Sequence, residues 1–152
     1  MTIFSYVYLA VFVIAAAVLV YVRTQLVFTA RPNRFFQWFY WAAAVMIGIF
    51  TVLTSRTPAD YISGFFITGM LGLFGFWRNG VTADSLITRI GAVRGLNSLT
   101  ALHLTVLPTG LTEVAPMVGS VTIAKLRLTQ SPAVLKAFLD KRMDPARVII
   151  DE

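Results

Sequence analysis

The stretch FFQWFYWAAAVMIGIFTVLTS, residues 35–55, is a run of 21 residues without a charge between Arg34 and Arg56. A transmembrane helix needs about 20 apolar residues, because the hydrocarbon core of a bilayer is about 30 Å thick and a helix rises about 1.5 Å per residue. We therefore predict that this segment crosses a membrane as a helix.

Two further uncharged segments lie on either side of this one. The first, residues 2–22, has 21 residues and is followed by Arg23. The other, residues 61–77, has 17 residues and is followed by Arg78. About 17 residues is the lower limit for a span, and Arg78 can extend its charged end toward water. For the first segment the alternative is a cleaved signal peptide, which requires basic residues before the apolar stretch, and none precedes Arg23. For the third segment the alternative is a buried or re-entrant hairpin.

The composition of the whole chain is typical of a membrane protein. The chain has 152 residues, of which 57% are hydrophobic and 13% are charged. A soluble domain has about 45–50% apolar and about 25% charged residues, so a disordered protein, a coiled coil and an ordinary cytosolic enzyme are excluded. Cysteine is absent, which excludes disulfides and thiolate metal sites. We predict three transmembrane helices in residues 1–78 (spans about 2–22, 35–55 and 61–77) and a small cytoplasmic domain in residues 79–152.

The connections between the predicted spans differ in charge. Residues 23–34 carry three arginines and no acid, residues 56–60 carry one arginine and one aspartate, and Arg78, Arg89 and Arg94 follow the third span. Because lysine and arginine accumulate on the cytoplasmic side, we predict a cell-membrane protein with its N-terminus outside and its C-terminal domain in the cytoplasm. Most of the net charge of +6 lies beside the spans, where topology accounts for it, so we expect no nucleic-acid partner.

One row of small residues follows the third span. Gly64, Thr68, Gly72 and Gly75 are spaced by four, four and three residues and therefore share one face of a helix. Small residues let helix backbones approach closely in lipid, so we predict that this row packs against another helix. The neighbour is either another span of the same chain, a second copy or a larger membrane partner. Gly69 lies off this row, so Gly72→Leu should disturb packing more than Gly69→Leu.

The last half of the chain combines strand and turn patterns. Apolar and polar residues alternate over 100–106 and over 121–129, which predicts two half-buried strands. Pro108-Thr109-Gly110 predicts a turn after the first of them. Residues 86–90 and 147–150 are further strand candidates.

A helix signal follows the second of these strands. Ser131 suits the N-cap, Pro132 the first helical position, and apolar residues recur from Val134 to Leu139. Asp144-Pro145 ends the pattern, so we predict a helix over residues 131–143. Together these elements predict a small α+β domain with antiparallel strands and one C-terminal helix.

Four segments carry a resemblance to a known group of proteins: Arg78-Asn79-Gly80-Val81 after the last span, the strand residues 102–104 and 125–128, and the closing helix 131–143. In this order the chain resembles small bacterial multi-pass membrane proteins of unknown function that carry a pleckstrin-homology-like cytoplasmic domain. The resemblance covers about half of the chain. It implies an interaction module and brings no catalytic residues with it.

Residues suited to catalysis are few. His103 is the only histidine and alternates with leucines on the polar side of a strand, so we interpret it as structural or solvated. Asp140 and Asp144 are four residues apart and could share a helix face, as a general acid and a general base would. Lys141 and Arg142 lie between them, however, and indicate a solvated helix end. Neither a nucleophile elbow nor a phosphate loop occurs. We expect no enzymatic activity, no cofactor and no metal site.

The remaining functional hypotheses concern binding. The predicted spans contain no ionisable residue, which argues against an autonomous ion-coupled transporter. The leading hypothesis is a non-enzymatic membrane protein with an interaction module in a regulatory, accessory or immunity-type role. The alternatives are a small accessory subunit of a transporter or channel, and a membrane enzyme acting on lipid.

The expected partners are the lipid bilayer, anionic lipid headgroups, a membrane protein and a second copy of the chain. Five basic residues are the predicted contacts for anionic lipid or a partner, because two lie on the outward face of a strand and three on the following helix. They are Lys125, Arg127, Lys136, Lys141 and Arg142.

Overall fold

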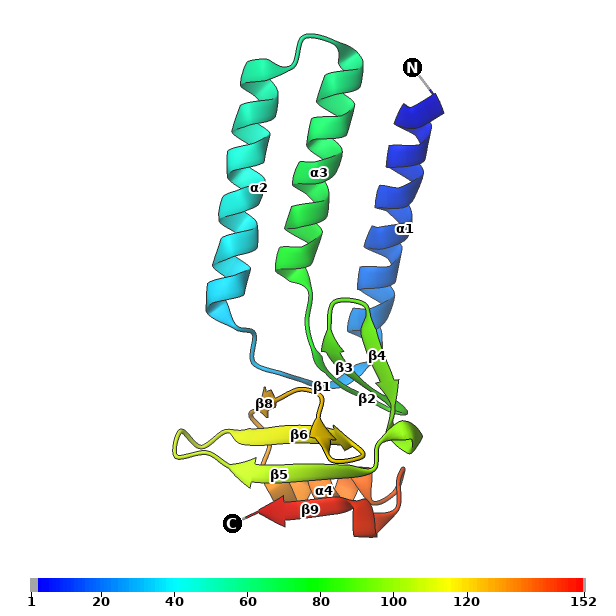
Figure 1. The fold of residues 1–152 in the computed structure, drawn as a ribbon, viewed down its shortest axis with the longest axis vertical. Helices are drawn as coiled ribbons and strands as arrows, with labels where there is room; N and C mark the ends of the chain where they lie inside the picture. The colour runs from blue at the N-terminus through cyan, green and yellow to red at the C-terminus, as the bar shows by residue number, and fades with distance from the viewer. Residues whose placement is uncertain (1–2, 152) are drawn as a thin grey trace. The chain divides into compact units, whose positions relative to one another are not determined.

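Three long helices, α1 (Ile3–Gln25), α2 (Arg34–Thr54) and α3 (Pro58–Phe76), form the first unit of the chain (Figure 1). The computed structural model describes residues 3–151, so residue 2, where the predicted first span begins, lies outside the described residues. All three helices are long and apolar enough to cross a membrane. The three predicted helical segments are therefore confirmed as helices.

Helix α3 begins three residues before the predicted segment because of its N-terminal cap. The Thr57 hydroxyl accepts a hydrogen bond from the Asp60 backbone N–H at 3.3 Å, and the Asp60 carboxylate accepts one from the Thr57 N–H at 3.0 Å. This capping box satisfies N–H groups that a helix start leaves without partners, and Pro58 suits the first helical position. As a result α3 has 19 residues, two more than the predicted 17.

The second unit contains two β-sheets, and in the first of them only the strand Ser85–Arg89 corresponds to one that the sequence predicted. Sheet A is antiparallel with the order β1 (Leu26–Thr29), β2 (Gly80–Thr82), β3 (Ser85–Arg89) and β4 (Ala92–Gly95). Strand β1 lies in the connection between α1 and α2. The second unit therefore consists of Gln25–Pro32 together with the chain from Arg78 onward, rather than of the later segment alone.

Strand β1 joins its unit through backbone and side-chain contacts. The Ala30 N–H donates to the Asn79 carbonyl at 2.9 Å, and Ala30 itself is buried. A side chain at Gly80 would overlap the Phe28 carbonyl oxygen, so glycine at this position lets β1 and β2 approach closely. The Phe28 ring packs edge-on against Phe138, with ring centroids 4.9 Å apart.

Sheet B has the order β7 (Val121–Thr122), β6 (Thr112–Val118), β5 (Ala101–Val106) and β9 (Val148–Asp151), and β8 (Leu126–Leu128) also pairs with β6. Three strand predictions are confirmed by β3, β5 and β9. One detail of the predicted fold class is wrong, because β9 pairs with β5 in parallel. Helix α4 lies between β8 and β9 in the chain, and such a crossover permits parallel pairing.

The predicted strand over 121–129 is interrupted in the structure. Its two ends form β7 and β8, and both pair with β6. Thr122 lies opposite Met117 and Leu126 opposite Val114, so four residue steps on one side face three on the other. This extra residue makes a bulge beside Pro116, which has no N–H to donate to a neighbouring strand.

Helix α4 (Pro132–Leu139) starts as predicted and ends early. Ser131 is the N-cap, and its hydroxyl accepts from the Val134 N–H at 3.5 Å. Beyond Leu139 the chain turns back, and the N–H groups of Arg142 and Met143 both donate to the Leu139 carbonyl. Residues 140–143 are thus outside the helix, which corrects the predicted end at residue 143.

The core of the second unit lies among the two sheets and α4. Its largest fully buried side chains are mostly leucines: Leu86, Leu96, Leu99, Leu102, Leu104, Leu128, Leu135 and Leu139. Phe28 of β1 and Phe138 of α4 pack against this cluster. The connection between the first two helices therefore contributes to the core of a unit whose other strands all follow α3.

Candidate functional site

The predicted row of small residues on α3 lies partly against α2. A side chain at Gly64 would overlap Thr51, which is buried on α2. A Cβ at Gly75 would lie 3.1 Å from the Trp41 indole nitrogen. Thr68 contacts the same helix, where Gly48 leaves room for it. Three of the four predicted packing residues thus face another helix of the same chain.

Gly72, the fourth residue of the row, has no close neighbour. A Cβ at Gly72 would find no atom within 4 Å, whereas one at Gly69 would lie 2.6 Å from the Phe12 ring of α1. The surroundings of the two glycines therefore do not favour the expectation that Gly72→Leu is the more disruptive substitution, which stays a prediction. The physical reason is that α3 has neighbours on two sides: α2 contacts the predicted row, and α1 contacts residues off it, including Phe66, whose ring stacks on Tyr8 at 5.0 Å.

Gly72 instead lines an open apolar groove between α2 and α3. The groove has a volume of about 610 Å³ and a nearly entirely apolar surface. The residues that line it include small residues of both helices, namely Ala44 and Gly48 of α2 and Gly69 and Gly72 of α3. A smaller cavity of about 330 Å³ lies between α1 and α3 and is lined mostly by aromatic rings. Apolar atoms make up nearly all of the lining of both, and neither is lined by Asp, Glu, Lys, Arg or His.

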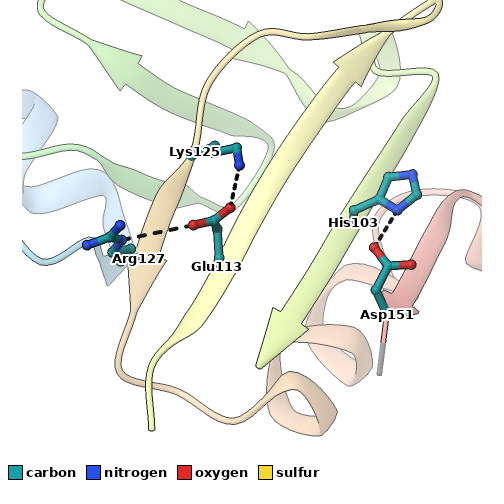
Figure 2. A network of polar contacts seen from close by, with 5 residues as sticks. All are labelled: His103, Glu113, Lys125, Arg127 and Asp151. Carbon is teal, nitrogen blue, oxygen red and sulfur yellow. Dashed lines mark hydrogen bonds and ion pairs between the residues drawn. The ribbon is translucent and has the colours of Figure 1, made fainter. Parts of the chain in front are cut away.

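A carboxylate on the outward side of sheet B binds two of the predicted basic contact residues (Figure 2). Glu113 of β6 lies 3.0 Å from the Lys125 Nζ and 4.0 Å from the Arg127 Nε. The two cations are exposed, while Glu113 is only 15% exposed. This pairing follows from the register, since Arg127 of β8 lies opposite Glu113. The three groups together carry a charge of only +1.

Two of the other predicted basic residues have contacts inside the unit. Lys136 donates from its Nζ to the Val148 carbonyl of β9 at 2.9 Å. Arg142 donates to the Phe138 carbonyl at 3.1 Å, and its guanidinium lies 3.7 Å from the centre of the Phe138 ring. Lys141 is exposed. Four of the five predicted contact residues therefore have partners within the unit.

A histidine–carboxylate pair lies on the same face of sheet B as Glu113, at the edge formed by β9. His103 Nδ1 of β5 lies 2.7 Å from the Asp151 carboxylate of β9, and both side chains are partly exposed (Figure 2). The sequence analysis missed this pair because the residues are 48 positions apart and meet only through the parallel pairing of β5 with β9. A hydrogen bond of this kind fixes β9 on the sheet.

The paired aspartates of the sequence analysis have separate structural roles. Asp144 accepts a hydrogen bond from the Ala146 N–H at 3.0 Å and caps the short 3₁₀ helix Pro145–Arg147. Asp140 ends α4, and its N–H donates to the Lys136 carbonyl. Over residues 3–151, no group of three or more histidines and acids is arranged to hold a metal ion.

Comparison with known proteins adds no further guide to the site. No protein family, no characterised protein and no solved structure matches this chain.

Proposed function

We propose that this protein is a multi-pass membrane protein whose three helices hold a non-enzymatic interaction module at the cytoplasmic surface. The proposal covers a regulatory, accessory or immunity-type role. The observation that carries it is strand β1, which connects the first two helices and is at the same time part of sheet A.

The membrane location is supported by the surface of the helices. Side chains such as Leu53, Phe35 and Trp38 are more than 70% exposed. A soluble protein rarely exposes contiguous apolar patches larger than a few hundred Å², and larger patches mark contacts with lipid or protein. A bilayer covers such helices along their whole length.

The topology is supported by the hydrogen bonds of β1. Because β1 pairs with β2, the connection between α1 and α2 must lie on the same side of the membrane as sheet A. Helices α2 and α3 leave from this side and return to it, so together they cross an even number of times. If α1 also crosses, the N-terminus lies on the opposite side.

The side itself is inferred from charge. On the side of sheet A this topology places Arg31 in the connection, Arg23 and Arg34 at the ends of α1 and α2, and Arg78 after α3. The opposite side has Arg56 in the connection between α2 and α3 and Asp60 in the first turn of α3. The more basic side faces the cytoplasm. The N-terminus is then outside.

The nature of the module is supported by its strand order. If β7 and β8 count as one interrupted strand, seven strands in two sheets precede the closing helix α4. A pleckstrin-homology-like domain, which the resemblance implies, has a barrel of seven strands. The segment after α3 supplies six of them, and β1 supplies the seventh. This arrangement favours the pleckstrin-homology-like reading, in which the module binds a partner and catalyses no reaction.

The alternative function, a small accessory subunit of a transporter or channel, is favoured by the open groove between α2 and α3. A helix of a larger membrane partner would fit its apolar surface and its small residues.

Purification of the full chain from native membranes in mild detergent distinguishes the interaction module from the accessory subunit. A stoichiometric membrane-spanning partner that is lost in a Gly72→Leu variant would favour the subunit. Recovery of the chain without such a partner favours the interaction module.

A further inference from the structure

The tip of the β3–β4 hairpin combines two features that the function above does not use. Arg89 pairs with Ala92 across the hairpin, which leaves Ile90 and Gly91 as a two-residue turn. Gly91 has a φ of +73°, a conformation that glycine adopts without strain. The tip is therefore a tight, well-defined turn at the end of two paired strands.

Exposed apolar and basic side chains lie next to one another around this turn. Ile90 is 39% exposed and Val93 is 53% exposed. They are flanked by Arg89 and Arg94, which are also exposed. Exposed aliphatic residues next to arginines suit a membrane surface, where the apolar groups enter the headgroup region and the cations meet phosphates.

The arginines of sheet A differ from the basic residues of sheet B in having no acidic partner among the described residues. Among the described residues, every ion pair lies on sheet B or its edges. No acid within residues 3–151 lies within 4.0 Å of Arg89 or Arg94, and Asp84 is the only acid between Arg78 and Leu111. Glu113 offsets part of the positive charge of Lys125 and Arg127, whereas no acid among residues 3–151 is close enough to offset that of Arg89 and Arg94.

Sheet A is joined to two of the helices by short connections. Strand β1 starts at Leu26, directly after the last residue of α1. Three residues separate the end of α3 at Phe76 from the start of β2 at Gly80. The four residue steps from Phe76 to Gly80 span at most about 14 Å when extended. In a chain whose helices cross a membrane, these connections limit the distance of β1 and β2 from the helix ends.

We propose that the β3–β4 hairpin tip, Arg89–Arg94, docks on the anionic leaflet of the membrane that the three helices cross. Ile90 and Val93 enter the headgroup region, and Arg89 and Arg94 contact lipid phosphates. The inference rests on the proposed function, because it requires the helices to be in the membrane. It uses a different surface from Lys125 and Arg127, which the sequence analysis predicted as lipid or partner contacts.

The test uses the full chain with a single cysteine, which is possible because the sequence contains none. Ile90→Cys carries an environment-sensitive dye, and the chain is reconstituted in nanodiscs of neutral lipid or of neutral lipid mixed with phosphatidylglycerol. Val121→Cys, which is exposed at the start of β7 in sheet B, is the matched control. Lipids with a spin label near the headgroup quench any dye that reaches the bilayer.

We expect blue-shifted, quenchable emission at position 90 in the anionic discs only, and water-like emission at position 121 in both. Added salt and the double variant Arg89→Gln/Arg94→Gln should reduce the docked fraction, by roughly fivefold in the docked-to-undocked ratio for each arginine lost. Water-like emission at position 90 in both disc types would overturn the proposal and favour a protein partner for the tip. Equal quenching in both disc types would overturn it as well. Stable incorporation of the chain into the discs reports on the helices separately, so failure of the docking and failure of the membrane location are distinguishable.

Discussion

At the scale of single residues, the glycines of α3 show what spacing can and cannot predict. The row of Gly64, Thr68, Gly72 and Gly75 follows from helical geometry, and three of its members contact α2. Spacing does not reveal how much room each residue of the row has toward the facing helix, because that room depends on the side chain opposite it. Thr51 fills the space at Gly64, while no atom fills the space at Gly72.

The two positions therefore make a matched pair of substitutions. Gly64→Ala should destabilise the packing of α2 on α3 by about 1–3 kcal/mol, the cost of overpacking a close contact. Gly72→Ala should change the stability little, because a methyl group there meets no atom within 4 Å. Thermal unfolding of the detergent-solubilised chain measures both. Thr51→Ala should restore much of the loss in the Gly64→Ala background, and equal stability of the two glycine variants would contradict the contact.

At the scale of elements, the alternating strands and the apolar spans could be predicted, and the elements without such a pattern could not. Strand β1 is only four residues long and follows α1 without a break, so it reads as part of a connection. The direction of β9 depends on the path of the chain around α4, which no local pattern encodes. The interruption between β7 and β8 depends on Pro116 of a different strand.

The contribution of β1 to its unit can be measured with two adjacent residues. Phe28→Ala should cost about 2–3 kcal/mol, somewhat below the range for a fully buried phenylalanine, because the ring is half-buried against Phe138. Val27→Ala, on the exposed side of the same strand, should cost far less. Resistance of the sheets to proteolysis in the reconstituted chain reports the difference. Identical resistance of the two variants would show that β1 is not part of the core.

The capping box of α3 makes a second prediction at this scale. Thr57→Ala removes the hydroxyl that accepts from the Asp60 N–H and should lower the stability of α3 by about 1 kcal/mol. Thr54→Ala, which loses only a hydrogen bond from its hydroxyl to the Phe50 carbonyl in its own helix, is the control. Hydrogen exchange over the first turn of α3 should increase in the first variant alone. An increase of the same size in both would argue against the cap.

At the scale of the whole molecule, the sequence predicts the helices and the later sheet unit. The structure shows that the connection between α1 and α2 also belongs to the sheet unit, through strand β1. The apolar spans and the later sheet unit follow from composition and periodicity. The basic residues of that unit could be identified in the sequence, but the partner of Lys125 and Arg127 could not, because Glu113 approaches them through the pairing of β6 with β8. Strand β1 joins a helix connection to the sheet unit, and from it follows the proposed topology.

That topology is tested most directly by the accessibility of single cysteines in intact cells, in a chain that otherwise has none. Val27→Cys lies in β1, Val121→Cys lies in β7, and Arg56→Cys lies between α2 and α3. We predict that a membrane-impermeant thiol reagent labels position 56 from outside, and that it labels positions 27 and 121 only after the membrane is permeabilised. Labelling of position 27 and position 121 from opposite sides, or labelling of both from outside with position 56 protected, would contradict the account.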